Sequence, residues 1–127
     1  MTTWVIINNG NGEMLVAKNG LGFEVDSTGL ANTIHAVQWD GTSGEVENKD
    51  ASTGEATGNT SITSFSDYDF AETAWDAAKA AEDAAEALAN AKAQAYQTAY
   101  DAAIANGDSE EDAQAAGQTA SDAVTSV

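Results

Sequence analysis

The residues that could perform acid–base chemistry are few. The single histidine, His35, stands in an alternating run with Val37 and Trp39, with no serine or carboxylate close to it in the sequence. Glu45 and Glu47 would share one face of a strand, where one carboxyl group could act as acid and the other as base. With 21 acidic residues against 4 lysines, such pairs also arise by chance. We therefore expect His35 to pack beside Trp39, the glutamates to be solvated, and no catalytic residue or enzyme activity.

Two polar segments offer oxygen ligands at short spacing, the kind that calcium prefers. They are NNGNGE at 8–13 and DSEED at 108–112. Neither fits the twelve-residue helix–loop–helix pattern, and turns and helix capping explain them. The glycine pairs at 10–12 and 20–22 do not open a helix, so they predict no phosphate loop. We expect no metal and no cofactor.

One alanine-rich segment carries the residues best suited to a contact with another protein. On a helical wheel its alanines gather on a broad face, and a face of methyl groups lets a second helix approach closely. Tyr96, Tyr100 and Ile104 follow at i, i+4 and i+8, and we expect them to pack on the sheet or on a neighbouring subunit. The predicted partner contacts are Ala78, Ala81, Ala85, Tyr96, Tyr100 and Ile104.

Residues 1–65 predict an antiparallel β module made of hairpins. Asn-Gly and Asp-Gly steps separate short apolar runs and supply the positive φ angles that tight turns need. In the Asp40–Gly44 turn we expect Gly44 to take a positive φ and Trp39 to be buried, fixing the register. Residues 48–60 contain no bulky side chain and predict a loop or a weak edge strand. The short apolar runs that predict strands lie at 4–7, 14–16, 21–25, 34–39 and 45–47.

Residues 66–127 predict an alanine-rich antiparallel helical hairpin. No glycine or proline interrupts 71–105, and Ser66 with Asp69, or Asp69 with Glu72, could form a capping box, so a long helix is expected at about 69–105. Asn106-Gly107 should end it, and Ser109 should cap a short helix at about 109–124. The fold class is therefore α+β, with half of the long helix left uncovered.

The composition points to a chain that needs a partner. Of the 127 residues 27 are alanine, which bury little apolar area, and the formal net charge is -17. Such values favour a stable structure only when something outside the chain completes the core. The acidity argues against electrostatic attraction to nucleic acid or to a membrane surface. The sequence has neither a basic leader nor a long apolar stretch, so we expect no signal peptide and no membrane span.

Two phrases carry a resemblance to a known group. IHAVQWDGTSGEVE at 34–47 and ITSFSDY at 62–68 resemble segments of small virion and tail-fibre-associated proteins of bacteriophages, especially marine ones. Phe65 stands where that group usually has Leu. The resemblance implies a structural protein of the virion, in the tail, baseplate, fibre base or capsid decoration, assembled in the host cytoplasm. It implies other virion proteins and copies of itself as partners.

Two other functions fit parts of the sequence. An acidic DNA mimic would need carboxylates spaced like phosphates over a wide surface, whereas the long helix collects its acids on a narrow strip. A receptor-binding tip module should show aromatic residues on exposed loops, and the loops here are rich in Gly, Thr, Ser and Asn. A structural subunit is therefore the favoured expectation.

Overall fold

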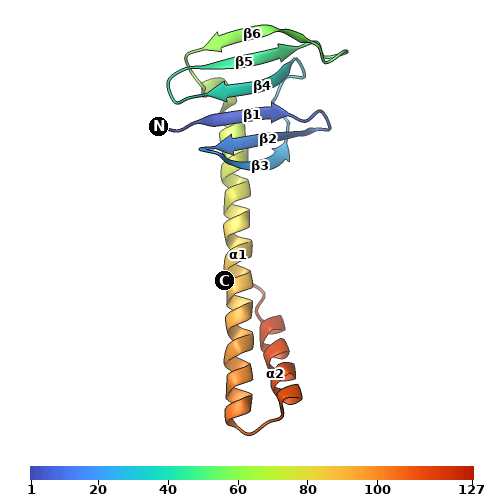
Figure 1. The fold of residues 1–127 in the computed structure, drawn as a ribbon, viewed down its shortest axis with the longest axis vertical. Helices are drawn as coiled ribbons and strands as arrows, with labels where there is room; N and C mark the ends of the chain where they lie inside the picture. Colours follow the sequence, from blue (N-terminus) through green and yellow to red (C-terminus); the bar gives the residue numbers. More distant parts are fainter. The chain divides into compact units, whose positions relative to one another are not determined.

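The computed structural model describes all residues 1–127 and has the predicted α+β fold. It divides into two compact units, Met1–Lys79 and Ala80–Val127. The first unit holds a six-stranded antiparallel sheet in the order β3-β2-β1-β4-β5-β6 (Figure 1). The strands are β1 (Trp4–Asn8), β2 (Glu13–Lys18), β3 (Leu21–Asp26), β4 (Ile34–Trp39), β5 (Gly44–Lys49) and β6 (Ala56–Ile62). A 3-10 turn, η1 (Ser66–Tyr68), leads into α1 (Asp69–Ala105), and α2 (Glu110–Ala123) ends the fold.

The hairpin turns confirm the predicted turn chemistry, with one correction. Asn19 and Gly20 have φ of 50° and 89° between β2 and β3, the left-handed pair of a two-residue turn. In the β4–β5 turn Gly41, at φ 102°, takes the left-handed conformation expected of Gly44. Gly44 is required for another reason: a Cβ there would collide with the carbonyl oxygen of Gln38.

A bulge in β4 overturns the expectation for the histidine. The register between β4 and β5 shifts between Ile34 and Ala36, which leaves His35 as the extra residue. Its side chain is exposed, while Val37 is fully buried. The expected packing of His35 beside Trp39 is therefore wrong, because the bulge breaks the strict alternation on which it rested.

The core of the first unit lies between one sheet face and the start of α1. Trp4 is 4% exposed, stacks on Phe65 with ring centroids 5.9 Å apart, and meets the ring of Trp75 edge-on at 6.0 Å. The indole Nε1 of Trp75 donates a hydrogen bond to the carbonyl oxygen of Leu21 at 2.9 Å. Trp39, expected to be buried, is half-buried and stacks on Phe65 at 5.8 Å. Trp4 is thus the tryptophan that anchors the sheet.

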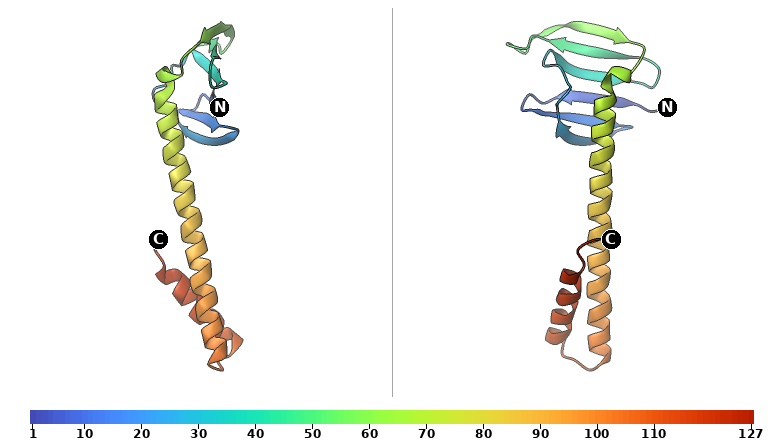
Figure 2. Two further views of the ribbon diagram at one scale, coloured as in Figure 1. Left: turned by 90° about the vertical axis from the view of Figure 1, so that its left-hand side faces the viewer. Right: turned by 180° about the vertical axis from the view of Figure 1, so that it is seen from behind.

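The first turns of α1 belong to this core, so the compact unit ends later than the predicted boundary at residue 65. Ala71 is fully buried and Trp75 is 8% exposed. Figure 2 shows the beginning of α1 lying across one face of the sheet. The Oγ of Ser66 lies 2.9 Å from that of Ser64 within the η1 region. The division at Lys79 agrees with this packing, since the helical turns that cover the apolar face of the sheet fall within the first unit.

The second unit is an antiparallel pair of helices with a small core. Gly107 has φ 87°, and its amide donates to the carbonyl of Ile104 at 3.0 Å, closing α1 as predicted. The hydroxyl of Ser109 accepts a hydrogen bond from the amide of Asp112 at 3.2 Å, which confirms the predicted N-cap of α2. Buried positions in the pair are small: Ala103, Ala113 and Gly117.

Candidate functional site

Two of the three predicted alanine contact residues lie on an exposed part of α1. Ala78, at the end of the first unit, is half-buried, whereas Ala81 and Ala85 are exposed. From Ala80 to Ala89 every residue except Leu88 is exposed. We call this stretch, Ala80–Ala89, the bare segment. It presents methyl groups and acidic side chains with no intramolecular neighbour helix, so any close helix–helix contact there must come from another chain.

The predicted aromatic contact residues are partly used within the chain. Tyr96 and Tyr100 are half-buried and their rings stack at 6.2 Å with an interplanar angle of 13°. A Cβ placed on Gly117 would lie 2.8 Å from the ring of Tyr96, so α2 passes directly over this ring. Tyr96 therefore packs on α2, where the sequence predicted the sheet or a neighbouring subunit. Ile104 is 44% exposed near the end of α1.

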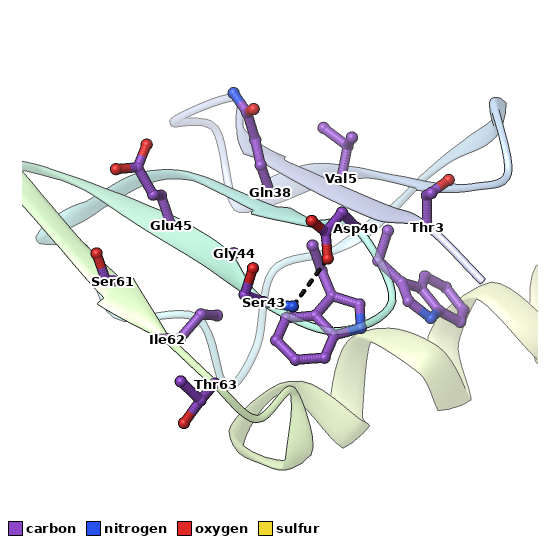
Figure 3. A pocket seen from close by; sticks show the side chains of 12 residues that line it. Thr3, Val5, Gln38, Asp40, Ser43, Gly44, Glu45, Ser61, Ile62 and Thr63 are labelled. Carbon is purple, nitrogen blue, oxygen red and sulfur yellow. Dashed lines mark hydrogen bonds between the residues drawn. The ribbon is translucent and has the colours of Figure 1, made fainter. Parts of the chain in front are cut away.

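The hollow drawn in Figure 3 does not gather its polar groups at one point. It has a volume of about 540 Å³ at the end of β1, β4, β5 and β6. The register explains its lining. Val5, Gln38 and Glu45 form one cross-strand row, whereas Trp39 and Ile62 belong to the row on the opposite face. Because successive side chains point to opposite faces, these groups do not converge on a common substrate position.

Several acidic side chains are occupied by turns. The carboxylate of Asp40 accepts hydrogen bonds from the amides of Thr42 and Ser43, each at 2.8 Å, and these bonds lower the pKa of Asp40. Burial and a hydrogen bond to Asp69 raise the pKa of Glu72.

No three His, Asp or Glu side chains are grouped so that they could hold a metal ion. Neither helix combines the length and apolar character needed to cross a membrane.

The sheet has a second apolar surface that the sequence analysis missed. Five residues, Val5, Ile7, Leu15, Ala17 and Ala36, lie on the face opposite the core, and we call them the uncovered face. In Figure 1 the sheet is seen from this side, with the beginning of α1 behind it. Four of them are half-buried and accessible, whereas Ala36 is 5% exposed. The signal was the run Trp4–Ile7, which is apolar at every position, as in a strand covered on both faces.

The predicted carboxylate pair also lies on this side of the sheet. Glu45 is exposed, and Glu47 is half-buried and accepts a hydrogen bond from the Nε2 of Gln38 at 3.2 Å. His35 lines a separate small hollow with Glu47 and Lys49. The hollow contains no serine, threonine or cysteine, so it offers His35 no hydroxyl or thiol to activate.

No protein-family model, curated protein or solved structure matches this chain. The resemblance to phage virion proteins therefore stays a prediction that rests on residues 34–47 and 62–68.

Proposed function

We propose that this chain is a structural subunit of a bacteriophage virion that works through protein–protein contacts. The observation that carries the proposal is the bare segment of α1. A helix face made of methyl groups gains little from contact with water, yet it allows the backbone of a second helix to approach closely. The resemblance of residues 34–68 to virion proteins supplies the setting, and the bare segment supplies the contact surface.

The distribution of the core supports the same role. The core of the first unit contains aromatic side chains. In the second unit the only fully buried residues are alanine and glycine. At about 25 cal/mol per Å² of apolar surface, such small residues contribute little to the stability of the helix pair. Contacts with other virion proteins, or with copies of this chain, would add the missing burial.

Mass spectrometry of purified virions tests the setting directly. Particles of the phage that encodes this chain should contain it as a component that stays with the particle through density-gradient purification. Its absence from purified particles, with the protein present in infected cells, would contradict the proposal.

Leucine substitutions test the contact surface. The double variant Ala81→Leu/Ala85→Leu should lower incorporation into particles by about tenfold, because added methylene groups prevent close helix approach at a cost of about 1–3 kcal/mol. Its melting temperature as a free chain should not fall, since both positions are exposed. Gln114→Leu, at an exposed position of α2, is the control for added apolar surface. Equal incorporation of the two variants would show that the bare segment is not the contact.

A further inference from the structure

We infer that the uncovered face of the sheet is a docking site for a basic amphipathic helix of another protein. The strand register arranges this face as two rows across the sheet. Leu15 of β2 pairs with Ile7 of β1, which pairs with Ala36 of β4. The parallel row runs from Ala17 through Val5 to Gln38. Figure 2, in its left view, shows the beginning of α1 on the other face of the sheet, so no other element of the first unit covers this one.

Acidic side chains stand at both ends of the first row, and at the β5 end of the second, whose β3 end is Gly22. Glu24 of β3 pairs with Leu15 at one end, and Glu47 of β5 pairs with Ala36 at the other. Glu45 of β5 ends the second row beside Gln38. The face is thus an apolar strip with carboxylates along both sides. Lys49, which lines a hollow with Glu47, is the lysine at this end of the strip.

The dimensions of the strip match one helix. Its accessible apolar side chains sit on β2 and β1, and Ala36 of β4 beside them is 5% exposed; these three adjacent strands span about 10 Å at the usual strand spacing. An α-helix with its side chains is about 10 Å wide. The side chain of Leu15 leans over Gly22 of β3, because a Cβ added to Gly22 would lie 3.0 Å from the Cδ1 of Leu15. Gly22 itself has no side chain that would rise above the strip at this side. Lysine or arginine on the two flanks of the docked helix would reach the carboxylates of β3 and β5.

Charge selects another protein over a second copy of this chain. The chain carries 21 acidic residues, 4 lysines and no arginine. Its own exposed helical surface, the bare segment, includes Glu82 and Glu86. Placing that helix on the strip would bring carboxylates against carboxylates, whereas a helix with basic flanks would be attracted. The inference rests on the proposed role in assembly, because it specifies one of the contacts that this role requires.

A pair of designed peptides tests the site on the full-length chain. Both are helical and carry leucine at the same i, i+3, i+4 and i+7 positions, and their flanks are lysine in one peptide and glutamate in the other. Fluorescence anisotropy of the labelled peptides should show binding of the lysine peptide alone, weakening as salt is added. Ile7→Gln/Leu15→Gln should weaken this binding by about tenfold through lost apolar contact.

Two matched pairs of charge variants separate the site from the general acidity of the chain. Glu24→Gln/Glu45→Gln and Glu82→Gln/Glu86→Gln each remove two negative charges, the first beside the strip and the second on α1. All four side chains are exposed, so neither pair should affect folding. Only the first pair should weaken binding of the lysine peptide.

Three results would overturn the inference: no binding of the lysine peptide, equal weakening by both charge pairs, or self-association that Ile7→Gln/Leu15→Gln abolishes. The last result would assign the face to a second copy of this chain. None of these results bears on whether the chain is present in virions. Failure of this docking site is therefore distinguishable from failure of the proposed function.

Discussion

At the scale of single residues, three aspartates hold the loops of the sheet with the same geometry. The carboxylates of Asp26, Asp40 and Asp50 each accept a hydrogen bond from the backbone amide two residues later, at 2.7, 2.8 and 2.8 Å. Hydrogen bonds favour the charged form. The pKa of Asp26 is lowered by the hydroxyl and then the amide of Thr28, and the pKa values of Asp40 and Asp50 are lowered by the amides three residues later and then by those two residues later. Three of the acidic residues of the chain therefore have a structural role, because their carboxylates hold turns.

Asp40→Ala should destabilise the chain at neutral pH and less so in acid. The pKa of Asp40 is lower in the folded state than in the unfolded state. Its contribution to stability is therefore present above the unfolded pKa and is lost as the pH falls through the folded value. Melting temperatures of the variant and the wild type, measured from neutral pH downward, should converge at low pH. Glu86→Ala removes the same charge from an exposed helix position and serves as control. A constant difference at all pH values would contradict this role for Asp40.

At the scale of elements, local signals predicted the helices and hairpins well. The expected long helix at 69–105 has the observed bounds, because alanine propensity and the Asn106-Gly107 stop act over a few residues. The turn at Asn19-Gly20 is likewise local. Residues 48–60 were predicted to form a loop or a weak edge strand, and the edge strand β6 begins within them, at Ala56.

Features that depend on how one element packs or pairs with another were not predicted. The bulge at His35 arises from the pairing of β4 with β5, and the close approach at Gly44 from the path of its neighbour strand. The contact of Tyr96 with α2 depends on how far along α1 the second helix lies, which no pattern in either helix specifies. The exposure of Ala81 and Ala85 follows from the short length of α2, and this part of the candidate surface was expected.

The close contact between α1 and α2 predicts whether Gly117→Ala raises or lowers the stability of the helix pair. Gly117→Ala should gain about 1 kcal/mol of helix propensity. It should also force the new Cβ against the ring of Tyr96, at 2.8 Å, and overpacking costs about 1–3 kcal/mol. We expect a net loss of stability of the helical unit, measured by thermal unfolding followed by circular dichroism.

A second background provides the control for this substitution. In a Tyr96→Ala chain the ring is absent, so Gly117→Ala should become stabilising. If the substitution has the same sign in both backgrounds, the close packing of α2 on Tyr96 is not the determining contact.

At the scale of the whole molecule, the core residues are unevenly divided. Every residue of the main apolar cluster, from Trp4 to Trp75, belongs to the first compact unit. The scarcity of large apolar residues that the composition indicates is therefore concentrated in the second unit. For this reason the sheet with its first helical turns should fold alone, while the helix pair depends on further contacts.

Two fragments test this division. Residues 1–79 should unfold cooperatively in urea and keep the near-ultraviolet circular dichroism of buried tryptophan. Residues 1–65, which end at the boundary that the sequence predicted, should not. The shorter fragment lacks Ala71 and Trp75, and with them the edge-on contact to Trp4 and the hydrogen bond to the Leu21 carbonyl. Loss of a buried tryptophan costs about 3–5 kcal/mol, a large part of the 5–15 kcal/mol that stabilises a typical domain. Cooperative folding of 1–65 with the stability of 1–79 would show that the sheet needs no helical cover, and the boundary at Lys79 would then have no energetic basis.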